Sequence, residues 1–234
     1  MLLPDWKEIV NAIDQNLWSE ERNAYVDSIG SKVVSQHANS LMVCFDFAPQ
    51  AKWSRILETI SDASKVIMTK TWSWDAIIRP FDPLENVVMA QPFYAHFLHA
   101  AYARAGRGDL LKISLLRWKN MIETYDTFWE SWELTSISST CHGFSATPAF
   151  DCSAYILGVS VLEPGYNKVA INPLELPGIT SANGVIPTPL GNLEVSLKIQ
   201  KSEICLDISV PQGMTVLIAG NNYDCGKHTI CYEI

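Results

Sequence analysis

The sequence lacks the features that mark a membrane-bound or secreted chain. No apolar run among its 234 residues approaches the length of a membrane-spanning helix. The first ten residues, MLLPDWKEIV, have no basic region, no apolar core and no small-residue cleavage site, so they do not resemble a secretory signal. No Asn-x-Ser/Thr sequence for N-glycosylation occurs. These absences predict a protein with no membrane partner and a cytoplasmic location.

The sequence also lacks any cysteine or histidine pattern typical of a metal site. Its six cysteines are scattered, and none forms a C-x-x-C pair: Cys44, Cys141, Cys152, Cys205, Cys225 and Cys231. His96 and His99 lie one helical turn apart but have no third ligand nearby, so we expect no metal and no cofactor. We expect free buried thiols, with a Cys225–Cys231 bond across a terminal hairpin as the alternative.

Positive charge is scarce as well. The chain has 17 Lys and Arg against 25 Asp and Glu, a formal charge of -8. This balance, without a basic stripe, argues against nucleic acid or an anionic membrane as a partner. With 48% hydrophobic and 18% charged residues, the composition indicates a globular chain that can bury a core.

Up to about residue 160, apolar residues recur at helical spacing. Five runs show this pattern, beginning near Trp6, Val33, Trp53, Phe93 and Leu111. Asp5 is the predicted N-cap of the first helix, and a last helix is expected between Pro148 and Gly158. The Gly106–Gly108 segment ends one helix, and Asp109 is expected to cap the next. The short connections predict antiparallel helical hairpins.

From about residue 166 the pattern becomes strand-like. Five segments alternate or run apolar between Gly, Pro and Asn turns: 168–171, 193–199, 204–210, 215–218 and 229–232. We therefore predict an α + β chain of two domains. A helical hairpin domain covers residues 1–160, and an antiparallel β-sandwich covers residues 161–234.

The stretch from Thr127 to Phe150 concentrates groups that suit a carbohydrate site. Two carboxylates (Glu130, Glu133), two indoles (Trp129, Trp132) and one imidazole (His142) occur in a segment too irregular for a buried helix. Indole faces pack against the apolar C–H face of a sugar ring, while a carboxylate positions or deprotonates a water.

The spacing in this stretch carries a resemblance. Trp-Glu-x-Trp, then Ser-x-x-His-Gly and Ala-x-Pro, resembles the signature of the α-L-rhamnosidases, which are inverting glycosidases with a six-hairpin helical barrel. Further segments match that family in the same order: Ser35–Asn39, Gln91–Tyr94, Ala105–Asp109, Arg117–Met121, Leu157–Val159, Glu163–Tyr166 and Pro187–Asn192. The chain resembles the C-terminal half of the family, with half of a six-hairpin α/α toroid before the β domain.

The resemblance implies a glycoside hydrolase that releases a terminal deoxysugar by inversion, in a truncated or degenerate form. Glu130 corresponds to the catalytic base, and Trp129, Trp132, Glu133 and His142 are the expected substrate-binding residues. The general acid has no matching position, because the family's lies in an acidic loop upstream of these hairpins. Three loop carboxylates remain as substitutes without a motif: Asp27, Asp75 and Asp82.

Each of these residues also has a structural interpretation. Glu130 and Glu133 suit surface or salt-bridged carboxylates, and His142 suits a helix-entry residue bonded to the backbone. Trp129 and Trp132 suit a core as well as a sugar platform. For Trp72 and Trp74, in TWSWD, we favour the structural role.

The alternative function is a non-hydrolytic protein that binds a sugar or small metabolite in the glycosidase-like cleft, or that completes its barrel with a partner chain. Half a barrel would expose an apolar face, for which Phe93, Phe97 and Trp118 are candidates. We therefore expect the chain to self-associate or to bind a partner chain, with a small glycoside as its ligand.

Overall fold

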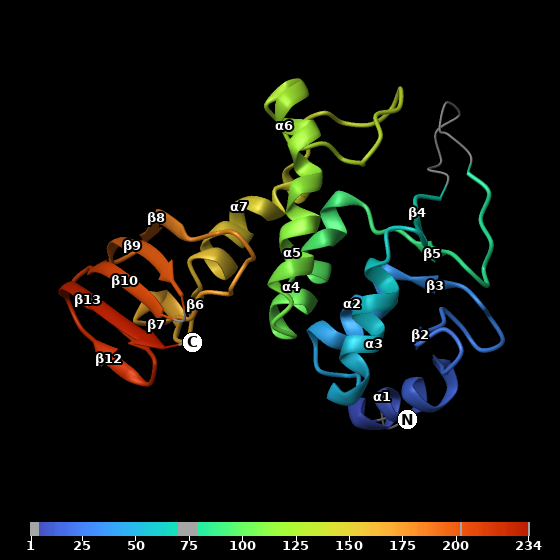
Figure 1. Ribbon diagram of the computed structural model, residues 1–234, viewed down its shortest axis with the longest axis horizontal. Helices are drawn as coiled ribbons and strands as arrows, with labels where there is room; N and C mark the ends of the chain where they lie inside the picture. Colours follow the sequence, from blue (N-terminus) through green and yellow to red (C-terminus); the bar gives the residue numbers. More distant parts are fainter. Residues whose placement is uncertain (1–4, 70–78, 202, 234) are drawn as a thin grey trace. The chain divides into compact units, whose positions relative to one another are not determined.

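Most of the helices come first in the chain and the two four-stranded sheets come last, as Figure 1 shows, so the predicted α + β class is confirmed. The computed structural model describes residues 5–69, 79–201 and 203–233. These residues form two compact units, Met1–Thr147 and Pro148–Ile234. Within the described ranges, no helix combines the length and the apolarity needed to cross a membrane.

The first unit is built mainly from α-helices. Its helices are α1 Trp6–Leu17, α2 Gln36–Cys44, α3 Gln50–Ser61, α4 Ala95–Arg104, α5 Gly108–Leu115 and α6 Lys119–Tyr125. The connections are short between α2 and α3 and from α4 to α6, but those from α1 to α2 and from α3 to α4 are long, so the expectation of short connections throughout is wrong. The short 3-10 turns η1 Pro92–Tyr94 and η2 Leu116–Trp118 adjoin these helices, and η3 Gly143–Ser145 lies in the Thr127–Phe150 stretch. Two-residue strands β3 Val34–Ser35, β4 Val66–Ile67 and β5 Val87–Val88 pair in parallel, and β1 Trp18–Ser19 pairs with β2 Ala24–Tyr25.

Local sequence signals account for some of these helix ends. Asp5 caps α1, since its carboxylate accepts a hydrogen bond from the backbone N–H of Lys7 at 3.3 Å. Gly106 ends α4 with a φ of +68°, a conformation that glycine adopts without strain. The prediction that Asp109 caps α5 is wrong, because the helix begins at Gly108 and Asp109 lies in its first turn. The Asp109 carboxylate instead accepts two hydrogen bonds of 2.8 Å from the Arg107 guanidinium.

One cluster of the first unit's core joins the helices to the Thr127–Phe150 stretch. Trp118, Met121, Ala95 and Trp129 pack together, and the Trp118 indole N–H donates to the Ser145 carbonyl at 3.0 Å. Trp118 is only 1% exposed, so its predicted place on an exposed apolar face is wrong. A large indole finds more contact area in the core than any surface offers.

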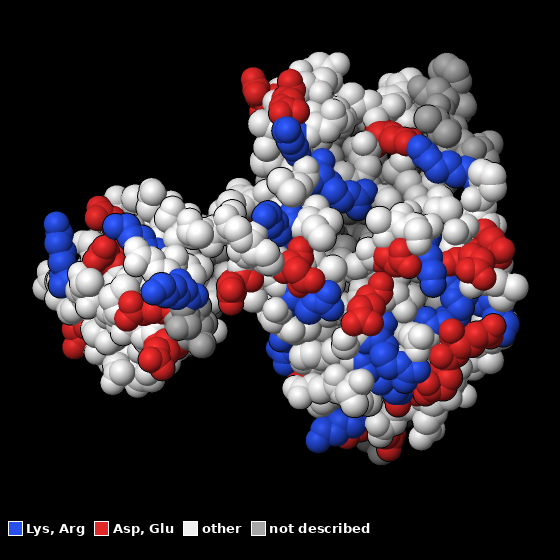
Figure 2. All heavy atoms as spheres, viewed as in Figure 1, with Lys and Arg blue, Asp and Glu red and all other residues white. Residues whose placement is uncertain are grey.

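Charged residues of the first unit are intermingled on the face that Figure 2 shows. Two ion pairs join α3 to the segment that begins with α1, Lys52 to Asp14 and Arg55 to Glu20, each at 2.6 Å. Pairs this close to solvent stabilise a fold by only about 1 kcal/mol or less.

The second unit begins with a short helix and continues as two sheets. The helix α7 Thr147–Asp151 passes into a π-helical turn, η4 Cys152–Ile156. The first sheet has the order β13-β10-β9-β8 and the second β12-β11-β7-β6. The strands are β6 Val159–Val161, β7 Lys168–Ile171, β8 Ser181–Thr188, β9 Gly191–Gln200, β10 Glu203–Val210, β11 Thr215–Ile218, β12 Asn221–Tyr223 and β13 Gly226–Glu233.

Buried side chains from both sheets form one core. Alternate residues of β9 and β10 contribute Leu193, Val195, Leu197, Ile204, Leu206 and Ile208, and the other sheet contributes Val169, Ile171, Val216 and Ile218. The β7–β11 pair is parallel, although only antiparallel pairs were expected. The chain passes through β8, β9 and β10 between these two strands, and such a crossover permits parallel pairing.

Gly158 joins η4 to β6 where the backbone of another segment passes very close. Its φ is +75°, and its carbonyl accepts a hydrogen bond from the Asn172 N–H at 2.9 Å. An added Cβ would lie 2.2 Å from the carbonyl carbon of Asn172 and from the nitrogen of Pro173. Only glycine fits this position.

Two cysteines of the second unit form a disulfide bond between neighbouring strands. Cys205 of β10 and Cys231 of β13 face each other in register and are bonded. The expectation that all cysteines are free is wrong for this pair, and the alternative partner, Cys225, is a free exposed thiol. Disulfides persist chiefly in oxidising compartments. The argument from free thiols therefore no longer supports the cytoplasmic location, which stays a prediction.

Removing this disulfide is expected to destabilise the second unit. The bond joins residues 26 positions apart. A loop of that length restricts the unfolded chain enough to stabilise the fold by about 3 kcal/mol. Urea unfolding of Cys205→Ser under non-reducing conditions measures this loss. The control Cys225→Ser should leave the free energy of unfolding unchanged, and equal effects of the two variants would contradict the expectation.

Candidate functional site

A pocket of about 670 Å³ in the first unit brings two of the predicted site residues together. Glu130 and His142 both line it, although they lie in different parts of the sequence motif. The other lining residues are His37, Thr69, Val88, Met89, Gln91, Phe93, Ser131, Thr135, Ile137, Ser138 and Phe144. Polar groups on partly apolar walls are typical of a site for a small ligand.

Backbone hydrogen bonds within the stretch bring Glu130 and His142 to one pocket. The Glu130 N–H donates to the Ser139 carbonyl at 2.9 Å, and the His142 N–H donates to the Phe128 carbonyl at 2.8 Å. The segment thus folds back on itself. The Ser138 hydroxyl bonds to those of Ser131 (3.1 Å) and Thr135 (2.7 Å), which joins the two sides further.

The Glu130 carboxylate is oriented by the backbone. Its Oε2 accepts a hydrogen bond from the Ser139 N–H at 3.0 Å, while Oε1 has no partner within the described residues. The Glu130 side chain is exposed. One oxygen is therefore fixed and the other is available to a water or a ligand hydroxyl, which is the arrangement that a general base requires.

His142 offers a second polar group to this pocket. Its imidazole lies with its ring centroid 5.7 Å from that of Phe144, whose side chain is 80% exposed. His142 is the N-cap residue of η3, and its carbonyl accepts a hydrogen bond from the Ser145 N–H at 3.0 Å, so its predicted role as a helix-entry residue bonded to the backbone is confirmed. Its ring nitrogens have no hydrogen-bond partner in the described part of the chain.

The two tryptophans of the motif lie outside the lining of the pocket. Trp129 is 4% exposed and belongs to the core cluster with Trp118 and Met121. The Trp132 indole N–H donates to the Ala90 carbonyl at 2.7 Å, and the Arg117 guanidinium lies over its ring at 4.1 Å. The structure therefore gives both indoles packing partners within the chain.

Glu133 forms an ion pair with Arg79. The guanidinium donates to both carboxylate oxygens, one at 3.2 Å. Since Glu133 is absent from the pocket lining, the structure places it in the structural role that the sequence also allowed. A substrate role for it stays a prediction.

Two of the loop carboxylates proposed as substitutes for a general acid, Asp27 and Asp82, are not among the lining residues of this pocket. Asp27 accepts a hydrogen bond from the Ser35 hydroxyl at 2.9 Å, and Asp82 accepts one from the Leu84 N–H at 2.9 Å. Asp75, like Trp72 and Trp74, lies outside the described residues. Glu130 is the only carboxylate among the pocket's lining residues in the described ranges.

His37 lines the same pocket, although helical periodicity predicts only an inward-facing position for it. It is the second residue of α2, and its ring lies 4.4 Å from that of Tyr94. Burial lowers the pKa of the imidazole, and the nearby Asp27 opposes this only in part, so His37 is neutral at pH 7. The sequence offers one signal for this position. His37 is a polar ring close to a helix N-cap, in the Ser35–Asn39 segment that matches the family.

One group of potential metal ligands occurs in the described residues, and it lies away from this pocket. Glu203, Cys205 and Cys231 approach one another closely enough to share an ion, but the two sulfurs are bonded to each other. A sulfur atom that is bonded in a disulfide cannot act as a thiolate ligand.

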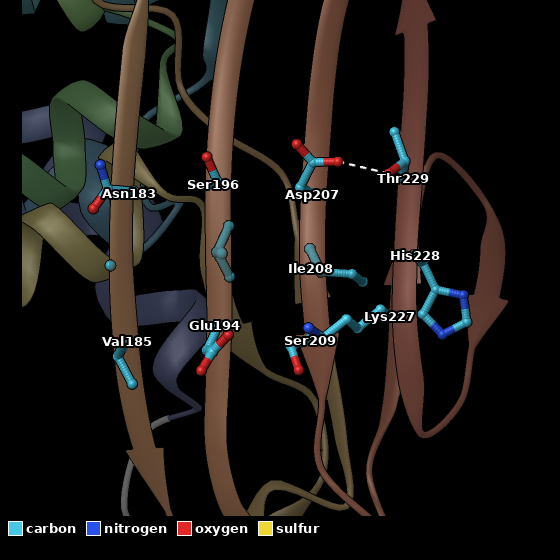
Figure 3. A pocket seen from close by; sticks show the side chains of 12 residues that line it. Asn183, Val185, Glu194, Ser196, Asp207, Ile208, Ser209, Lys227, His228 and Thr229 are labelled. Carbon is cyan, nitrogen blue, oxygen red and sulfur yellow. Dashed lines mark hydrogen bonds between the residues drawn. The ribbon is translucent and has the colours of Figure 1, made fainter.

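A second hollow, of about 460 Å³, lies on the β13-β10-β9-β8 sheet of the second unit. Figure 3 shows two rows of side chains across its four strands: Asn183, Ser196, Asp207 and Thr229, then Val185, Glu194, Ser209 and Lys227. The Thr229 hydroxyl donates to the Asp207 carboxylate at 2.6 Å. Such rows are usual on the solvated face of an antiparallel sheet. The pocket of Glu130 and His142 is therefore the better candidate site.

Comparisons with known proteins agree with the sequence resemblance. Residues 158–230 match the family model described as the bacterial alpha-L-rhamnosidase C-terminal domain. No curated protein matches the chain.

Solved structures share the fold over nearly the whole chain. Native α-L-rhamnosidase from Aspergillus terreus matches 96% of this chain at 15% identity, with a TM-score of 0.68. The Streptomyces avermitilis enzyme complexed with L-rhamnose matches 97% at 16% identity and a TM-score of 0.68, and that from Dictyoglumus thermophilum 90% at 20% and 0.66. This chain covers 26%, 24% and 22% of those chains, respectively, and so spans about a quarter of their length.

Proposed function

Because the resemblance of this chain to the C-terminal part of the α-L-rhamnosidases is confirmed, we propose that it serves inverting hydrolysis of a glycoside with a terminal deoxysugar. One observation carries the proposal. Glu130 and His142, which the family motif marks as base and sugar contact, line one pocket of the first unit. In this proposal the helices form part of a six-hairpin toroid, and the two sheets form the β-sandwich that follows it.

In the proposed mechanism Glu130 is the general base that activates the attacking water. Its free Oε1 removes a proton as the water attacks the anomeric carbon and the bond from that carbon to the leaving oxygen breaks, while the Ser139 N–H holds Oε2 in place. A phenolate can leave with the bonding electron pair unaided, whereas an alcohol needs a proton from a general acid. His142 donates or accepts a hydrogen bond at a sugar hydroxyl. Val88 and Phe93 supply apolar surface for the sugar ring.

Hydrolysis of an aryl α-L-rhamnoside by the purified chain tests this function. Proton NMR during the first minutes should show L-rhamnose appearing as the inverted β anomer, because one displacement by water inverts the anomeric carbon. Absence of hydrolysis at all protein concentrations would contradict the proposal. The retained anomer as first product would contradict the mechanism.

A second candidate function follows from the single carboxylate in the pocket lining. Inverting hydrolysis needs a general acid as well as a base, and within the described residues Glu130 has no carboxylate companion there. The alternative is therefore a non-hydrolytic protein that binds a sugar or small metabolite. Binding of L-rhamnose without hydrolysis of the aryl glycoside would favour this alternative.

We also propose that the chain self-associates through exposed aromatic side chains of the first unit. Successive ring contacts join Trp6, Phe47, Phe45 and Phe97, here called the aromatic strip. Trp6 and Phe45 are at least half exposed. A second copy of the chain would remove these rings from water, and we expect the resulting interface to bury on the order of 1,000 Å² in total.

Light scattering at micromolar concentration is expected to give a mass above the 26.1 kDa of one chain. Phe45→Ser should shift the distribution towards the single chain, because it removes the centre of the aromatic strip. Ile29→Ser, at an exposed apolar residue outside the strip, is the control. A monodisperse single chain would rule out self-association and leave a partner chain as the alternative.

A further inference from the structure

We propose that His37 is a further ligand-binding residue of the pocket, whose imidazole hydrogen-bonds to a hydroxyl of a saccharide that also contacts Glu130 and His142. The inference rests on the proposed function, and it adds a residue from a different part of the chain. It is carried by the hydrogen bonds of the Ser35–Asn39 segment.

The polar neighbours of His37 in this segment are fully engaged in holding the fold. The Ser35 hydroxyl caps α2 by accepting from the Ala38 N–H at 3.3 Å. The Gln36 amide donates to the Ile60 carbonyl at 2.7 Å and accepts from the Ala90 N–H at 2.8 Å.

Asn39 is engaged in the same way. Its side chain accepts from the Tyr25 N–H and donates to the Tyr25 carbonyl, both at 2.8 Å, and it also bonds to the Ser35 carbonyl at 3.0 Å. Every polar side chain of the segment apart from His37 therefore has a structural partner.

The His37 imidazole differs from these neighbours. The ring is half-buried and lines the pocket, yet neither ring nitrogen has a hydrogen-bond partner among the described residues. A partly buried polar group without a partner costs stability unless water or a ligand bonds to it. The pocket is where such a ligand would lie.

Tyr94 holds the ring in position from outside the pocket lining. Its hydroxyl donates to the His37 carbonyl at 3.0 Å, and the two ring centroids lie 4.4 Å apart. The Gln36 side chain fixes the adjacent turn of α2. An imidazole held on a capped helix by two neighbours is preorganised, as binding residues need to be.

The chemistry of the pocket favours a neutral, hydroxyl-rich ligand. A neutral imidazole has one donor and one acceptor nitrogen, and a hydroxyl group can pair with either. The Glu130 carboxylate in the same lining repels carboxylates and phosphates. Val88 and Phe93 supply apolar contact for the C–H face of a sugar ring.

Titration of the chain with L-rhamnose, followed by calorimetry, tests the inference. His37→Phe keeps a flat ring against Tyr94 but removes both nitrogens. The dissociation constant should rise roughly threefold to tenfold, which is the loss expected for a neutral hydrogen bond. His37→Gln, which restores a donor and an acceptor, should recover part of the affinity.

His228→Phe is the matched control. His228 is also half-buried, but it belongs to the second unit and bonds to the Asp224 carbonyl at 2.7 Å. Its replacement should leave the dissociation constant unchanged. Unaltered affinity in His37→Phe, with the wild-type chain binding L-rhamnose, would overturn the role of His37 and leave the proposed function standing.

NMR of the wild-type chain provides a test that needs no substitution. Addition of L-rhamnose should shift the imidazole signals of both His37 and His142, and not those of His228. Shifts confined to His142 would overturn the inference alone. Absence of any shift and of any heat of binding would overturn the proposed function and this inference together.

Discussion

Replacing Glu130 by Gln is expected to reduce glycoside hydrolysis by about two to four orders of magnitude, the usual contribution of a positioned general base. Gln has almost the same volume, and its amide oxygen can still accept the hydrogen bond from the Ser139 N–H. It cannot take a proton from water at the position of Oε1. The loss should therefore appear in kcat, measured with an aryl α-L-rhamnoside at saturating concentration.

Two controls separate this chemical effect from a structural one. Glu133→Gln, three residues after Glu130, alters a carboxylate that pairs with Arg79 and should reduce the rate far less. The melting temperature of Glu130→Gln should match that of the parent chain. Equal activity of Glu130→Gln and parent would remove Glu130 from the mechanism, and a large fall in melting temperature would show a structural role.

Gly158→Ala is expected to cost on the order of 4 kcal/mol or more of the free energy of unfolding, a large share of the 5–15 kcal/mol typical of a domain. The added Cβ would lie 2.2 Å from backbone atoms of Asn172 and Pro173, and backbone cannot move aside as a flexible side chain can. The φ of +75° adds strain for any residue with a Cβ. Urea unfolding measures the loss.

Gly106→Ala is the matched control, because it shares the backbone conformation without the close approach. Its φ is +68°, and an added Cβ meets no atom within 4 Å. It should cost only the about 1–2 kcal/mol of a left-handed conformation. Equal losses in the two variants would show that the contact with Asn172 and Pro173 relaxes at little cost.

Local signals in the sequence predict much of the fold. The bounds of β7 and β11 coincide with the apolar segments 168–171 and 215–218, and Asp5 caps α1. The strand β8 was missed because Gly184 and Pro187 interrupt its pattern, and pairing with β9 along its whole length supports it instead. The parallel partnership of β7 and β11 depends on contacts between distant segments, which local periodicity does not contain.

The candidate site was predicted only where a motif marked it. Glu130 and His142 come from the Trp-Glu-x-Trp and His-Gly patterns, and both line the pocket. Sequence alone does not distinguish an indole that binds sugar from one that packs in the core, and Trp129 is buried. The sequence does not mark His37 as a lining residue of the pocket, because it does not show which polar residues of the Ser35–Asn39 segment bond within the fold. Only the hydrogen bonds of its neighbours reveal that His37 differs from them. The Cys205–Cys231 pairing likewise follows from strand register.

The Cys205–Cys231 bond has a consequence for aggregation. In the order β13-β10-β9-β8, the outer strands are β13 and β8, and each presents unpaired backbone groups to other chains. β8 carries Pro187, which has no N–H to offer. The β13 segment contains no proline, and the disulfide joins it to β10 near the chain's C-terminal end. Reduction would leave only the ladder hydrogen bonds to hold this end of β13 against β10. Where those bonds open, the freed edges of β10 and β13 become templates for strand addition between molecules.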